Sequence, residues 1–243
     1  MNSFVRRLSL ILTVGIFLAF AVYTVRAQKV DKEKLDAGTR RATNAAKVLT
    51  DLTALAPGEG IPKELLAKAH IIAVFPNVTK INLLFQKAMK GYGLAARRTD
   101  GGWSTPAYYG FGVSDKGWTS VKSESPGIVM LFMNESALKD FEKDHVAIAG
   151  AVAGPVGEMD ADGAKRVANA RMVVYAVGDD KLKGVSIADD DSAISGLGMD
   201  NNINKAVFGL KGNEVFWGKV PLTSPVPAEI TAFQNALAAL TKP

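Results

Sequence analysis

The chain has 243 residues and no cysteine, which excludes disulfides, thiolate metal sites and a lipid-modified cysteine. Its formal net charge is +5, but three of its basic side chains, Arg6, Arg7 and Arg26, lie in the first 27 residues, so the rest of the chain is nearly neutral. A basic field over the whole molecule, as nucleic-acid binding requires, is therefore not supported.

The first 27 residues have the pattern of a secretion signal. Two arginines precede an apolar run over residues 8–22, and Val25-Arg26-Ala27 has the spacing of small residues before a cleavage point. We predict export, with cleavage after Ala27, to a periplasmic or membrane-associated location. The alternative is an uncleaved anchor, because residues 8–25 reach the minimum of about 17 for a membrane span. Residues 28–243 have the length of a single domain.

Helical periodicity marks both ends of that domain. Residues 31–55 are predicted to form an amphipathic helix with a thin, alanine-rich apolar stripe, which packs on the domain or, alternatively, lies on a membrane surface. A break at Pro57-Gly58-Glu59-Gly60 precedes a short helix that opens at Ile61-Pro62. A last helix is predicted over residues 228–240, after Pro225 and Pro227.

The segment between these helices predicts many short strands. Residues 71–75 are a continuous apolar run of strand length, and strands at 81–86 and 91–97 flank a predicted turn at 87–90. The sequence indicates a helix at 137–141 and further strands at 103–109, 110–121, 127–133, 146–153, 171–177, 184–187 and 213–218. We predict an α+β fold with a mostly antiparallel, curled or barrel-like sheet and flanking N-terminal and C-terminal helices.

The residue pattern predicts no reaction centre. His70 and His145 have no partners at the spacing of a metal site or a general base, and we expect surface or helix-end histidines. Residues 160–163 and 189–191 are rich in Asp but lack the downstream Glu of a Ca²⁺ loop, so we expect acidic turns. The serines lack a Gly-x-Ser-x-Gly elbow. We predict a protein that is not an enzyme and has no catalytic residue, cofactor or metal; an enzyme with an unrecognised site is the least favoured alternative.

Basic residues concentrate between positions 80 and 122, near several aromatic residues. On one face of a sheet they would bind an anionic lipid surface, each contributing ~1 kcal/mol close to the membrane. The alternative is that they are solvated surface side chains. Neighbours on a strand point to opposite faces, so only one of Arg97 and Arg98 can belong to such a patch. The candidate lipid-binding residues are Lys80, Lys87, Lys90, Arg97, Trp103, Lys116, Trp118 and Lys122.

A resemblance to a known family covers residues 35 to 209. The segments that carry it are Gly91-Tyr92-Gly93, Gly102-Trp103-Ser104-Thr105-Pro106-Ala107, Gly150-Ala151-Val152-Ala153-Gly154-Pro155-Val156-Gly157, Gly184-Val185-Ser186 and Phe208-Gly209. In this order and spacing they resemble the SYLF domain, a lipid-binding module of bacterial exported proteins and of eukaryotic proteins that join phosphoinositide membranes to actin. The chain departs from the family at Asn82, Gln86 and Lys87, where the family is usually rich in glycine.

The resemblance implies a non-catalytic domain that binds anionic phospholipid at a bacterial envelope membrane, without nucleic acid. Actin binding belongs to the eukaryotic relatives, and we do not expect it of an exported bacterial-type protein. The alternative function is a structural or protein-interaction module of the cell envelope, with a protein partner and no lipid ligand.

Overall fold

The computed structural model describes residues 32–82, 87–114, 127–143, 145–178, 181–187, 195–222 and 225–242. The predicted signal segment lies outside these residues. The helices are an N-terminal helix over 32–53, α2 (Lys63–Lys68), α3 (Glu135–Asp140), α4 (Ala161–Val167), α5 (Asn201–Phe208), α6 (Gly212–Trp217) and α7 (Ala228–Leu240). The strands are β1 (Ile71–Phe75), β2 (Val78–Asn82), β3 (Lys87–Thr99), β4 (Gly102–Trp103), β5 (Ala107–Ser114), β6 (Gly127–Phe132), β7 (His145–Ala147), β8 (Val152–Ala153), β9 (Met172–Gly178), β10 (Lys181–Gly184) and β11 (Gly196–Met199).

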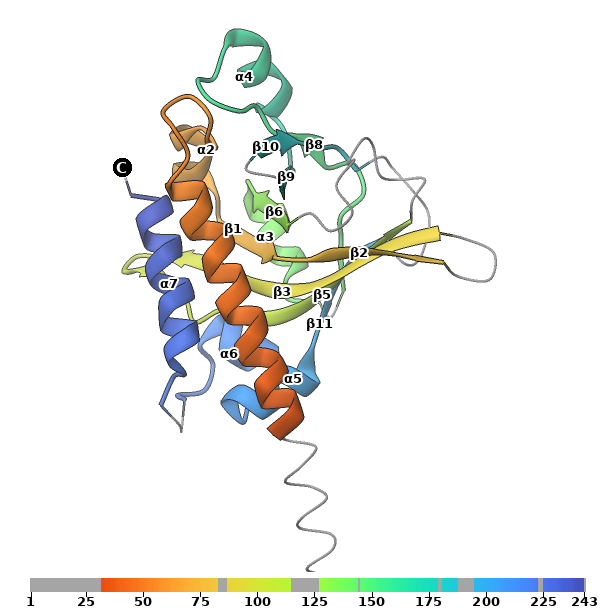
Figure 1. Cartoon of the computed structure of the whole chain (residues 1–243), viewed down its shortest axis with the longest axis vertical. Coiled ribbons are helices and arrows are strands. Elements are labelled where there is room, and N and C mark those ends of the chain that lie inside the picture. The colour runs from red at the N-terminus through yellow and green to blue at the C-terminus, as the bar shows by residue number, and fades with distance from the viewer. Residues whose placement is uncertain are drawn as a thin grey trace, which may run out of the picture.

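These strands form one curled sheet in the shape of a half-barrel (Figure 1). The strand order is β10-β9-β6-β1-β3-β5-β11-β7, with β2 and β4 paired to β3 at its ends. Every pairing between strands is antiparallel except that of β8 with β9. The predicted α+β class, with a mostly antiparallel curled sheet and helices at both ends, is confirmed.

One face of the sheet is covered by the N-terminal helix and α7, which lie side by side in Figure 1. Residues at three- and four-residue spacing on the N-terminal helix, Ala42, Ala45, Leu49 and Leu52, are buried against this face. Alanine has little side chain to separate helix from sheet, so the thin stripe seen in the sequence is a packing surface. Among the described residues, none of the helices is both long and apolar enough to cross a bilayer.

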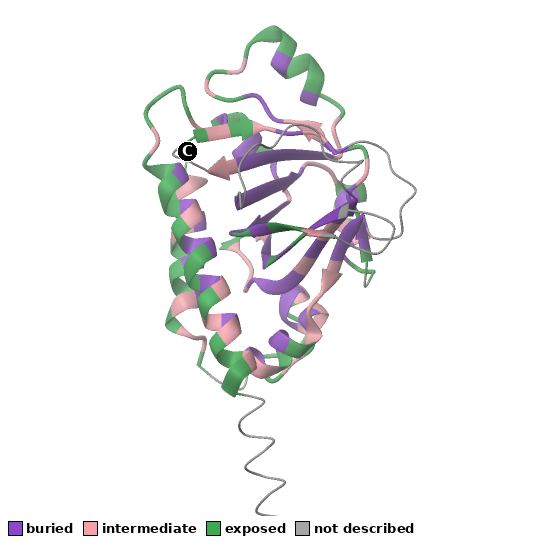
Figure 2. Cartoon of the chain, turned by 45° about the vertical axis from the view of Figure 1, so that its right-hand side comes forward, coloured by how far each residue is buried: buried purple, intermediate pink, exposed green. Residues whose placement is uncertain are grey.

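The other face encloses a second core inside the curl, against α3 and α6. Phe141 of the turn after α3 lies edge-on to Phe132 at 4.8 Å and stacks on Phe216 of α6 at 5.3 Å, between ring centroids. Strand β1 is buried on both faces, which explains its continuous apolar run. Figure 2 shows the buried central strands, with exposed residues on the outer sides of the helices.

The structure overturns several sequence predictions. Residues 213–218, a predicted strand, form α6, because the Glu214 carboxylate accepts the backbone N–H of Lys211 at 2.7 Å and Gly218 ends the helix at φ 63°. The predicted turn at 87–90 is the start of β3, which pairs with β5 from Ala88 onward. The predicted acidic turn at 160–163 opens α4, where the Asp160 carboxylate accepts the N–H of Gly163 at 2.6 Å.

Candidate functional site

The two adjacent arginines of the predicted patch bind helix ends on opposite sides of the sheet. Arg97 donates from Nε to the Phe216 carbonyl (2.9 Å) and from Nη2 to the Trp217 carbonyl (3.3 Å), at the C-terminus of α6. Arg98 donates from Nε and Nη2 to the Ala69 and Leu66 carbonyls (2.9 and 2.6 Å), at the C-terminus of α2. Arg97 is thus engaged within the fold.

Of the predicted lysines, Lys80 and Lys90 have described side chains, and the structure does not bring these two together. Lys80 pairs with Met89, whereas Lys90, the next residue of β3, pairs with Thr79, so the two lysines lie on opposite faces of the sheet. Both are exposed. Arg97 is seven residues from Lys90, roughly 23 Å along an extended strand. Lys80, Lys90 and Arg97 therefore do not lie together on one face of the sheet.

The remaining candidates are half-buried or lie outside the described residues. The indole N–H of Trp103 donates to Thr241 Oγ1 at 3.0 Å, and the Arg98 guanidinium stacks 4.5 Å from the centre of the indole ring. Trp103 therefore packs β4 against α7. The side chain of Lys87 and the whole of Lys116, Trp118 and Lys122 lie outside the described residues.

The side chains whose pKa is shifted are removed from water by the fold, and most of them hold elements of the fold together. Burial raises the pKa of three tyrosines, Tyr108, Tyr109 and Tyr175, which we call the buried tyrosines. Two of them donate to backbone carbonyls: Tyr108 to Gly38 and Tyr175 to Pro155, each at 3.0 Å. Burial also lowers the pKa of Arg98. Within the described part of the chain, no three His, Asp or Glu side chains are grouped so that they could hold a metal ion.

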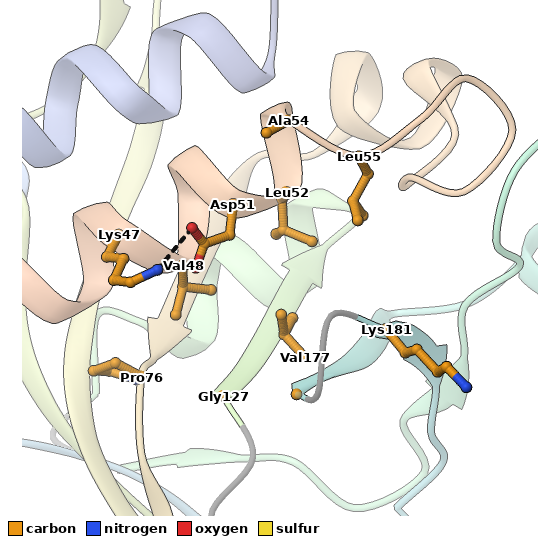
Figure 3. Close-up of a pocket in the computed structure, with 11 residues that line it drawn as sticks. Lys47, Val48, Asp51, Leu52, Ala54, Leu55, Pro76, Gly127, Val177 and Lys181 are labelled. Atoms are coloured by element: carbon orange, nitrogen blue, oxygen red, sulfur yellow. Dashed lines mark hydrogen bonds and ion pairs between the residues drawn. The ribbon is translucent and has the colours of Figure 1, made fainter.

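A groove of about 450 Å³ lies between the last turns of the N-terminal helix and the ends of β1, β6, β9 and β10 (Figure 3). Its volume is in the range of small-molecule sites, about 300–1,000 Å³. The apolar lining comes from both the helix and the strands, and charged residues lie at the rim. The lining residues are Lys47, Val48, Asp51, Leu52, Ala54, Leu55, Pro76, Gly127, Val177, Gly178 and Lys181.

The groove stays open because a glycine stands where strand β6 begins. A Cβ atom added at Gly127 would lie 3.4 Å from Val48 Cγ2 and 3.5 Å from the Val177 carbonyl oxygen. Any larger side chain there would project between helix and strand and fill the space. Val48, Leu55 and Val177, which line the groove, are only half-buried. The groove thus exposes apolar walls to solvent in a place where the core could have closed.

Charge at the rim comes from one ion pair and one lysine. Lys47 and Asp51, one turn apart on the helix, form an exposed pair at 2.7 Å. The aliphatic stem of Lys181 lines the rim, and its ammonium group extends away from the other lining side chains (Figure 3). The rim therefore carries a small positive excess over an apolar interior.

Comparison with known proteins leaves the family open. No protein-family model matches the chain, and a search of curated proteins gives no match. The groove residues were not among the sequence candidates. Two groove residues stand out in the sequence: Pro76, directly after the first strand, and Gly127, at the start of another strand. The sequence does not show that they lie close together, because that depends on the order of the strands in the sheet.

Proposed function

We propose that the protein is a non-catalytic, exported lipid-binding module whose ligand is an anionic phospholipid of a bacterial envelope membrane. The observation that carries this proposal is the open groove with apolar walls and a small positive excess at its rim. Such a site suits an acyl chain inside and a negatively charged group outside. The proposal agrees with what the resemblance to the SYLF domain implies, and the resemblance alone supplies the envelope setting.

The size of the groove makes affinity depend on tail length. Each buried methylene contributes ~0.8 kcal/mol, so two further methylenes should tighten binding more than tenfold while the groove still has room. Binding to a surface lysine cluster has no such dependence. A series of lysophospholipids of increasing chain length, measured by calorimetry below their micelle concentration, therefore tests whether a tail is buried.

Substitution at Val48 tests the site. Val48→Glu places a charge on the apolar wall and should weaken binding by at least tenfold. Thr43→Glu is the matched control, because it adds the same charge to the same helix about 140° away, where Thr43 is exposed. Val177→Trp fills the groove without adding charge and should also weaken binding. Because the two substitutions differ in chemistry, a loss seen in both is not explained by a folding defect in one of them.

Each result has a defined meaning. Full lipid binding by both groove variants would refute the groove as the site. A wild-type chain that binds no lysophospholipid and no vesicle, but cross-links to an envelope protein, would refute lipid binding and favour the interaction module.

A further inference from the structure

The sheet surface that borders the groove continues past it toward β3. Strands β1 and β3 pair at Val74 and Leu94, and Pro76, which lines the groove, lies two residues beyond Val74. This β1–β3 register ends at Val74 and Leu94, and the β2–β3 register begins at Val78 and Gly91, so Pro76 and Tyr92 both lie in the short stretch between the two pairings. Because alternate residues of a strand share a face, Tyr92 lies on the side covered by the N-terminal helix, as Leu94 does. The aromatic ring of Tyr92 therefore lies on the same face of the sheet as the groove.

Tyr92 is the centre of a cluster with two cations. It is one of the few large apolar side chains that are exposed, at 40%. The Arg41 guanidinium lies 4.3 Å from the ring centre, and the Lys90 ammonium lies 5.5 Å from it. Arg41 comes from the N-terminal helix, whose later turns line the groove. The cluster and the groove thus share one helix and one sheet face.

The charges of this cluster are only partly balanced. Arg41 is paired to Asp200 at 2.7 Å, and both side chains are about four-fifths buried. Lys90 forms no ion pair with any carboxylate of the described residues. Within the described part of the chain, the positive charge of Lys90 near the Tyr92 ring is therefore not balanced by a carboxylate.

Space beside the ring is open on the side away from the groove. Tyr92 pairs with Gly110, which pairs with Gly198 on the next strand. A Cβ added at Gly110 would lie 3.6 Å from the Tyr92 ring, and one added at Gly198 would meet nothing within 4 Å among the described atoms. A polar group bound to Lys90 would thus find room against the sheet surface.

We propose that Lys90, Tyr92 and Arg41 form the headgroup subsite for the lipid whose tail occupies the groove. This inference rests on the proposed function. Gly127 and Tyr92 lie on strands two steps apart, about 10 Å at 4.8 Å per step. One leaflet of a bilayer core is ~15 Å thick, so a tail in the groove and a phosphate at Lys90 fit within one lipid molecule.

The same geometry selects against a choline headgroup. The face of an aromatic ring attracts quaternary ammonium groups, but here two protein cations already lie near the Tyr92 ring. A further positive group would be repelled, whereas a phosphate can accept hydrogen bonds from Lys90 and the tyrosine hydroxyl, close to the positive charge of Arg41. The subsite therefore prefers a lipid with net negative charge.

The experiment compares the full chain and its variants on vesicles of phosphatidylcholine alone and of phosphatidylcholine with phosphatidylglycerol. Lys90→Gln should lower affinity for the anionic vesicles about fivefold and leave binding of a neutral lysolipid unchanged. Tyr92→Ala should also reduce the preference for anionic vesicles. The matched control is Lys80→Gln, which removes an exposed lysine from the neighbouring strand on the opposite face.

The outcomes separate this inference from the proposed function. Equal losses in Lys90→Gln and Lys80→Gln would show a general charge effect and overturn the subsite. Tail binding that depends on Val48, with an anionic preference unchanged by Lys90→Gln and Tyr92→Ala, would overturn the subsite and leave the groove standing. A wild-type chain that takes up no lipid would refute the proposed function itself.

Discussion

Replacing Asn204 with alanine should lower the free energy of unfolding by about 2–4 kcal/mol, because this side chain joins α5 to β5. Asn204 is fully buried. Its Oδ1 accepts the backbone N–H of Tyr108 at 2.9 Å, and its Nδ2 donates to the carbonyls of Tyr108 and Asp200, each at 3.0 Å.

The magnitude follows from which groups lose their only partner. The Tyr108 carbonyl still accepts the N–H of Asp200 at 2.9 Å, and the Asp200 carbonyl still accepts the backbone N–H of residue 204 at 3.0 Å. Only the Tyr108 N–H is left buried without a partner, at a cost of about 1–3 kcal/mol. The space vacated by the amide adds a further cavity term of about 1 kcal/mol.

Urea unfolding followed by circular dichroism measures this loss as a lower midpoint at an unchanged m value. The control is Asn202→Ala, which removes the same amide from an exposed position of the same helix and should change stability by no more than about 0.5 kcal/mol. If Asn204→Ala costs less than about 1 kcal/mol, or no more than Asn202→Ala, then the amide does not hold α5 to the sheet.

Three further predictions concern packing and charge. Arg98→Lys should lower the free energy of unfolding by about 1–3 kcal/mol, because an ammonium group cannot reproduce the two hydrogen bonds to the end of α2. Thermal melts that match wild type would contradict this. Gly154→Ala, whose Cβ would overlap the Tyr175 ring, should destabilise by about 1–3 kcal/mol, whereas Gly101→Ala has free space; equal urea midpoints would refute the overlap. The pKa values of the buried tyrosines are raised in the folded chain, so their contribution to the free energy of unfolding is complete below about pH 10 and is lost as the pH rises further. Ultraviolet absorbance measures their ionisation, and reversible ionisation near pH 10 in a chain that stays folded would contradict this prediction.

The elements of the fold could be predicted where the local sequence has a clear pattern, either a continuous apolar run or helical spacing of apolar residues. The buried strand at 71–75 and the helix at 228–240 have the bounds expected from the sequence. A strand was predicted over residues 213–218 because Val215, Phe216 and Trp217 favour strands. The helix found there depends on a carboxylate cap and on packing against Phe141. The cap and the contact with Phe141 together outweigh the strand propensity of these residues, and the contact with Phe141 cannot be read from the local sequence.

The candidate site was harder to predict than the fold. Its residues come from the N-terminal helix and four strands, and they meet only because β6 lies between β1 and β9. Basic residues close in sequence suggested a patch instead, yet strand alternation separates Lys80 from Lys90, and helix ends bind Arg97 and Arg98. The expectation that Arg97 and Arg98 would face opposite ways is correct.

That arginine pair also has a consequence for how the chain finds its fold. A strand displaced by one residue reverses every side chain from one face to the other. For β3, such a slip would move both guanidinium groups away from their helix ends at once, so that both pairs of hydrogen bonds would be lost. The ends of α2 and α6 can therefore both accept these arginine hydrogen bonds only when β3, the longest described strand, is paired in its observed register.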